Sequence, residues 1–378
     1  MKKVKYWLLA GGVMLLAIIY GVMSDKDSML SKLKAVAEQG DVNAQYALGL
    51  MYYYGEDAEV DYKQAKLWYE KAAANNDSRA QVKLGEMYAH SIGVNQDYQQ
   101  SKEWYEKAAA SKNIDAQFLL GEMYDDGNGV KQDYHQAKVW YEKAAVLGDV
   151  RAQVNLGVIY AKGNGVTQDY RQAKRWYEKA AVQNSADAQF ALGIMYANAY
   201  GVEKDYQQAK NWYEKAAAQD FANAQFNLGM LYYKGDGVNK NYQKAKEWFE
   251  KAATQNQANA QYNLGQIYYY GQGVAQSYRN AKVWFEKAAG QNHVDAQYNL
   301  GVMYENGEGV CQDYQQARIW YEKAAAQGDA RAQFDLGVMN YLGQGEVVNF
   351  EQVRTWFGLA CQNGHKEGCE RYKALSEE

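Results

Sequence analysis

An Ala-Gln pair recurs every 36 residues along most of this 378-residue chain. The pair stands at residues 44–45, 80–81, 116–117, 152–153, 188–189, 224–225, 260–261, 296–297 and 332–333. Tryptophan keeps the same interval from Trp68 to Trp356. Nine in-phase copies without an insertion predict a one-dimensional stack of one supersecondary unit.

Each copy contains two helical patterns. In the first, Ala44, Leu48 and Met51 recur at the spacing of one apolar helix face. The second opens at a good N-cap residue, and Ala65 and Tyr69 then line its apolar face. The predicted caps are Asp61, Asp97, Asp133, Asp169, Asp205, Asn241, Ser277, Asp313 and Asn349. The predicted fold class is therefore all-α: a solenoid of nine 36-residue helix-turn-helix repeats with capping helices.

The first residues differ from the repeats. Lys2, Lys3 and Lys5 precede an apolar run from Trp7 to Met23, the pattern of a signal peptide or of an uncleaved signal anchor. The end of the run offers a poor cleavage site, so we expect one span of an inner membrane, with the repeats in the periplasm. Secretion after cleavage is the alternative. The predicted parts are 1–24, the anchor or signal peptide; 25–40, an N-terminal cap helix; 41–364, the nine repeats; and 365–378, a C-terminal cap helix.

The repeated sequence pattern resembles that of a known family. The pattern AxxxLGxxYxxGxGVxxDYxxAxxWYEKAA is similar to the SEL-one-like repeat (SLR), a relative of the tetratricopeptide repeat, over about residues 40–370. The resemblance implies a right-handed α-superhelix and an adaptor or scaffold role in protein complexes. The ninth repeat departs from the pattern at Asn340 and Glu346.

Two of the three cysteines extend this resemblance. Cys361 and Cys369 resemble the cysteine pair of the cysteine-rich branch of the family, which implies a disulfide that fastens the C-terminal cap in an oxidising compartment. The alternative is two buried small residues. Cys311 is left over, as an inert thiol or an intermolecular link.

The sequence predicts no catalytic, metal or cofactor site. The four histidines lie in different repeats without ligand spacing, and no basic cluster suits nucleic acid. Residues 31–34 spell SxxK, a nucleophile motif of penicillin-interacting enzymes, but its companion motifs are missing. Because the cysteine-rich branch has been linked to β-lactam binding, a β-lactam-hydrolysing enzyme is kept as an alternative.

The resemblance also suggests where a partner binds. In tetratricopeptide-like hairpins the first helix lines a concave groove, and asparagine at the phase of residue 47 holds a ligand backbone. The predicted partner-binding residues are Asn155, Asn227, Asn263, Asn299, Tyr233, Tyr269 and Tyr270. The alternative is that these asparagines bond between adjacent repeats and hold the superhelix together.

Together these features predict a non-catalytic scaffold of the bacterial envelope that binds a protein or an extended peptide in its groove. The membrane is expected to contact the N-terminal helix only. A secreted factor that acts on host proteins is a further alternative.

Overall fold

The structure is a computed structural model that describes residues 26–56, 58–345 and 347–377. This part of the chain is all-α and contains no strand. Its helices are α2 (Lys26–Glu38), α3 (Val42–Tyr54), α4 (Tyr62–Ala74), α5 (Ser78–Ala89), α6 (Tyr98–Ala110), α7 (Ile114–Asp126), α8 (Tyr134–Val146), α9 (Val150–Lys162), α10 (Tyr170–Val182), α11 (Ala186–Asn198), α12 (Tyr206–Ala217), α13 (Ala222–Lys234), α14 (Tyr242–Thr254), α15 (Ala258–Tyr270), α16 (Tyr278–Ala289), α17 (Val294–Asn306), α18 (Tyr314–Ala326), α19 (Ala330–Leu342), α20 (Phe350–Gln362) and α21 (Lys366–Glu377).

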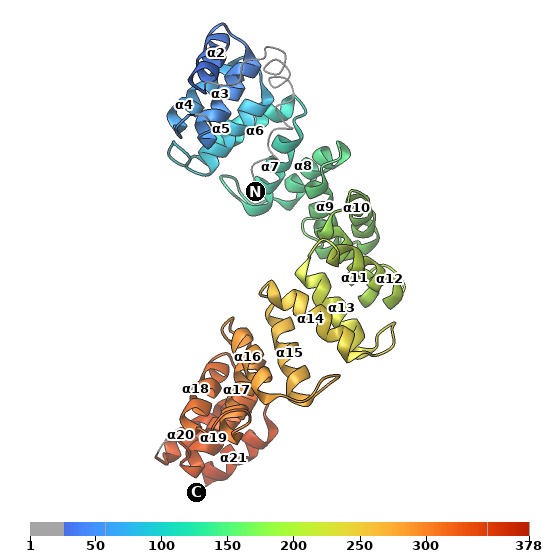
Figure 1. Cartoon of the computed structure of the whole chain (residues 1–378), viewed down its shortest axis with the longest axis vertical. Coiled ribbons are helices and arrows are strands. Elements are labelled where there is room, and N and C mark those ends of the chain that lie inside the picture. The colour runs from blue at the N-terminus through green and yellow to red at the C-terminus, as the bar shows by residue number, and fades with distance from the viewer. Residues whose placement is uncertain (1–25, 57, 346, 378) are drawn as a thin grey trace. The chain divides into compact units, whose positions relative to one another are not determined.

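These helices form two compact units, one that ends at Gln183 and one over Asn184–Glu378. Within each unit, every helix packs against the next one along the chain, which confirms the predicted repeat solenoid (Figure 1). The odd-numbered helices α3 to α19 are the first helices of the nine repeats, and the even-numbered helices α4 to α20 are the second helices.

The predicted N-caps form as expected. The Asp61 carboxylate, for example, accepts hydrogen bonds from the backbone N–H groups of Lys63 and Gln64 at 2.9 and 3.0 Å. The side chains of all nine predicted caps accept such a bond at the start of the second helices. Each bond satisfies N–H groups that have no partner inside the helix, so the helix start is fixed at this residue.

The core lies between one repeat and the next. Ala65, Tyr69 and Ala72 of α4 are buried together with Leu84 and Met87 of α5. The invariant glycine of each first helix makes room for this packing, since a Cβ at Gly49 would collide with the Tyr69 ring. A single repeat would leave this face exposed, so neighbouring copies supply the burial that stabilises each unit.

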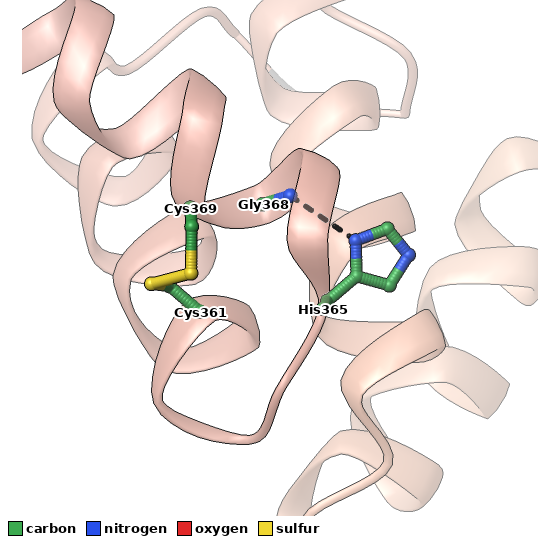
Figure 2. The surroundings of a disulfide bond; sticks show 4 residues. All are labelled: Cys361, His365, Gly368 and Cys369. Atoms are coloured by element: carbon green, nitrogen blue, oxygen red, sulfur yellow. Dashed lines mark hydrogen bonds between the residues drawn. A yellow bond between two sulfur atoms is a disulfide. The ribbon is translucent and has the colours of Figure 1, made fainter.

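The last helix is attached by two local links (Figure 2). Cys361 of α20 and Cys369 of α21 form a disulfide, with their Cα atoms 4.4 Å apart. Between them, His365 Nδ1 accepts a hydrogen bond from the Gly368 backbone N–H at 3.1 Å. Cys311 is an exposed free cysteine.

The predicted inner-membrane placement needs correction. Within the described ranges, no helix has the length and apolar character needed to cross a membrane. These helices have no more than 13 residues, or about 20 Å, whereas the hydrocarbon core is about 30 Å thick. The run from Trp7 to Met23, on which the prediction depended, lies outside the described residues. The prediction of a membrane-spanning protein is therefore wrong for the part of the chain that the structure describes.

Candidate partner-binding face

The first helices of successive repeats lie next to one another. In the first unit, Arg151 of α9 forms an ion pair with Asp115 of α7 at 2.6 Å. In the second unit, Arg331 of α19 forms the same kind of pair with Asp295 of α17, also at 2.6 Å. We call the surface of the first helices at the repeat phases of residues 43, 46, 47, 50, 53 and 54 the A-helix face. It contains every predicted partner-binding residue.

Three of the four predicted asparagines bond to a tyrosine of the preceding repeat. The side-chain amides of Asn155 and Asn227 interact with the hydroxyls of Tyr141 and Tyr213, which lie 14 positions earlier, and each interaction lowers the pKa of its tyrosine. Burial raises the pKa of Tyr213 to about 12, against the lowering effect of the Asn227 hydrogen bond. These contacts join adjacent repeats, which is the structural alternative to partner binding.

Asn299 makes an equivalent bond to a different tyrosine. Its amide interacts with the hydroxyl of Tyr262, 37 positions earlier, which also accepts a hydrogen bond from Gln266 Nε2 at 2.8 Å, and burial raises the pKa of that tyrosine to about 12. The residue 14 positions before Asn299 is Phe285, which has no hydroxyl. This contact joins the first helices α15 and α17 of adjacent repeats.

Asn263 differs from the other three. Its Nδ2 donates to the backbone carbonyl of Asn259 in its own helix at 2.7 Å. The residues 14 and 37 positions earlier are Phe249 and Phe226, so neither offers a hydroxyl. Among the described residues, its Oδ1 and second N–H have no hydrogen-bond partner.

The three predicted tyrosines also differ in availability. Tyr233 is half-buried and packs edge to face on Tyr242, with ring centroids 5.2 Å apart. Tyr269 packs on Tyr278 and donates its hydroxyl to Glu308 Oε2 at 2.5 Å. Tyr270 is 60% exposed, and of the three it offers the most surface to a partner.

Several carboxylates lie on this face, or next to it, in the last two repeats. Glu305 accepts a hydrogen bond from the Tyr321 hydroxyl at 2.6 Å, and Glu308 accepts the one from Tyr269. Burial raises the pKa of Asp335 to about 7, despite a hydrogen bond with Tyr298 that lowers it. No lysine or arginine of the described ranges forms an ion pair with Glu305 or Glu308. Glu305 and Asp335 thus lie on the A-helix face of the last two repeats, and Glu308 lies in the turn that follows α17.

The other sequence motifs show no such gathering of side chains. Ser31 and Lys34 of the SxxK tetrapeptide lie exposed on α2. His293 and His365 have a role that the sequence did not reveal, since they cap α17 and α21, respectively, through Nδ1. Each lies 36 residues from Asp329, which caps α19, and this spacing could have indicated the role.

Comparison with known proteins identifies the repeat. The family model of the Sel1 repeat matches residues 42–77, 78–113, 114–149, 150–185, 186–221, 222–257, 258–293, 294–329 and 330–365. No curated protein matches the chain.

Two solved structures are similar over most of the chain. A protective antigen of uropathogenic Escherichia coli strains, which displays an SLR fold, is 37% identical, with 92% of this chain and 75% of that chain covered and a TM-score of 0.78. A Sel1 repeat protein from Oxalobacter formigenes is 31% identical, with coverage of 81% and 90% and a TM-score of 0.69.

Proposed function

The chain belongs to the Sel1 repeat family, and from that premise we propose that it is a non-catalytic scaffold that binds a partner protein through the A-helix face. The Sel1 repeat solenoid is typical of protein–protein interaction scaffolds. One observation carries the proposal: the buried core residues are nearly the same in every repeat, whereas the residues of the A-helix face differ from repeat to repeat. At the phase of residue 47 the copies carry Ala47, Lys83, Leu119, Asn155, Ala191, Asn227, Asn263, Asn299 and Asp335.

The disulfide supports one further part of the proposal. A bond such as Cys361–Cys369 persists in oxidising compartments and is rare where thiols are kept reduced. We therefore propose that the protein acts in an oxidising compartment.

Affinity capture from extracts of the source cells tests the binding face. Tyr270→Ala with Tyr341→Ala alters two first helices, at side chains that are 60% and 52% exposed. The matched control, Val283→Ala with Ile319→Ala, alters the second helices α16 and α18 at side chains that are 45% and 43% exposed. We expect the first variant to lose a protein that the wild type and the control retain. Loss in the control alone would place binding on the second helices and overturn the proposal.

A further inference from the structure

Exposed apolar side chains gather at the turn between α19 and α20. They are Tyr341 at 52%, Leu342 at 58%, Val347 at 85%, Val348 at 42% and Phe350 at 62% exposure. The rings of Tyr341 and Phe350 meet edge to face, with their centroids 6.2 Å apart. We call these five residues the repeat-9 turn patch. Single exposed apolar residues are ordinary, whereas a contiguous patch of them marks an interaction surface.

The patch replaces a polar pair that other repeats have in their turns. In repeat 8, Gln312 Nε2 donates to the Glu305 backbone carbonyl at 2.8 Å and interacts with the Tyr314 hydroxyl at 3.0 Å. Repeats 2 and 4 contain the same pair of contacts. Repeat 9 carries Val348 and Phe350 at these two positions, so both polar groups are lost together. The fold does not require apolar side chains here, because the polar pair occurs elsewhere in the stack.

Phe350 lacks a hydroxyl although its ring is well exposed. The other eight repeats have tyrosine at this position, at residues 62, 98, 134, 170, 206, 242, 278 and 314. In repeats 2 to 8 this tyrosine is half-buried. The turn of the next repeat lies close to it: a Cβ at Gly309, for example, would lie 2.7 Å from Tyr278 Cβ. A ring that is both more exposed and less polar than its counterparts is expected where another molecule covers it.

The turns themselves indicate which surface of a second copy fits the patch. A turn lies over the tyrosine of the preceding repeat because its second glycine has no side chain, as Gly345 does over the Tyr314 backbone. A second copy would extend the stack with the turn of its first repeat, but that repeat has Asp57 at the glycine position. Aspartate adds a Cβ and a charge, so it does not suit the exposed Phe350 ring. The surface of matching chemistry is the patch of the second copy.

The charges around the patch also permit this pairing. None of the five patch residues is charged, so two patches that face each other bring no like charges together. Besides the patch, residues 341–354 contain two acids and one arginine, Glu346, Glu351 and Arg354. A two-fold axis lets an acid of one copy lie opposite the arginine of the other.

We propose that the repeat-9 turn patch joins two copies of this chain in a dimer with two-fold symmetry. The inference does not depend on the proposed function. Tyr341 and Leu342 also belong to the A-helix face, whereas Val347, Val348 and Phe350 lie outside it. Replacements at the latter three positions therefore test the dimer without altering that face.

Sedimentation equilibrium of the full chain tests the dimer. Cys311→Ser in every sample removes the free thiol, so no disulfide between copies contributes. We expect this parent protein to form a dimer, which Val347→Lys should weaken about tenfold or more, because two lysines would meet at the axis. The matched control is Val182→Lys, which alters a side chain on α10 that is 87% exposed and should leave the dimer unchanged. A monomeric parent, or equal association of the two variants, would overturn the inference.

Oppositely charged variants test the two-fold axis. Val347→Lys and Val347→Asp should each be monomeric at concentrations where the parent protein is dimeric, because each brings like charges together. An equimolar mixture of the two should associate again, and this association should weaken as salt is raised. A mixture that stays monomeric would show that residue 347 does not face its own counterpart, and the two-fold dimer would be wrong.

Val348→Gln with Phe350→Tyr tests the patch without adding charge. The double variant restores the polar pair of repeat 8, and its glutamine can donate to the Tyr341 carbonyl as Gln312 does to Glu305. The melting temperature of the monomer should be kept or raised, while the dimer should weaken about tenfold. Unchanged dimer affinity in this folded variant would show that the patch is not the interface. The capture experiment then still decides the proposed function separately.

Discussion

At the scale of single residues, the repeats differ in how they satisfy one buried glutamine. In repeat 4, Gln183 donates to Oε1 of the buried Gln153 at 3.0 Å. The equivalent of Gln183 in repeat 3 is Leu147, and Oε1 of Gln117 has no partner in the described part of the chain. A buried acceptor without a donor lowers stability.

Leu147→Gln should therefore stabilise the protein. We expect a gain of about 1 kcal/mol, because the new amide satisfies Gln117 and the lost leucine is 44% exposed. Urea denaturation measures the change. Leu147→Ala serves as the control, since it removes the same apolar surface without supplying a donor. An equal shift in both variants would show that the hydrogen bond is not the cause.

Asp335 gives a second prediction at this scale. Burial raises its pKa from 3.8 to about 7 in the folded state. The folded chain thus binds the proton more tightly, so the contribution to stability is complete below 3.8 and is lost as pH rises through about 7. Asp335→Asn, which matches Asn299, should be more stable than wild type by roughly 1–2 kcal/mol at pH 8. A stability difference that does not change between pH 4 and 8 would contradict this account.

At the scale of helices, the histidine that caps one first helix, α17, makes its repeat sensitive to acid. His293 Nδ1 accepts from the Ala296 backbone N–H at 3.3 Å, and Nε2 lies 3.1 Å from Asn259 Oδ1. Its ring stacks on Tyr262. Burial lowers the pKa of His293, with Asp295 opposing. Protonation would turn the Nδ1 acceptor into a donor and remove the cap.

His293→Asp should remove this sensitivity. Because the folded pKa is lowered, the contribution of neutral His293 is present above the unfolded value of 6.5 and is lost as pH falls through the folded value. The wild type should lose about 1 kcal/mol relative to the aspartate variant between pH 7 and 5. Thermal denaturation of both proteins at pH 7 and at pH 5 checks this prediction. If the difference between their melting temperatures is the same at both pH values, the histidine cap has no such role.

The sequence could predict the helices but not every contact between them. Periodicity and the Asp61-type caps define both helices of each repeat, since these signals are local. The capping role of His293 was missed because histidine is not a usual cap residue. The difference between Asn263 and Asn299 depends on residues 14 and 37 positions earlier. Those spacings have meaning only once the packing of successive repeats is known.

At the scale of the whole molecule, stability should be distributed along the stack. Within each unit a repeat packs mainly on its sequence neighbours, so damage at one end need not spread. Cys361→Ser with Cys369→Ser should cost about 2 kcal/mol in the last repeat and increase hydrogen exchange in α20 and α21. Exchange in α3 to α9 should not change. Cys311→Ser is the control, and loss of protection in both units would contradict local coupling.

The central claim is that the A-helix face binds the partner. The most direct test replaces Tyr270 or Val283 with a photo-crosslinking amino acid in the full chain and counts covalent adducts in the source cells. These side chains are exposed on a first and a second helix, at 60% and 45%. The account predicts a specific adduct at Tyr270 and none at Val283. An adduct at Val283 without one at Tyr270 would contradict it.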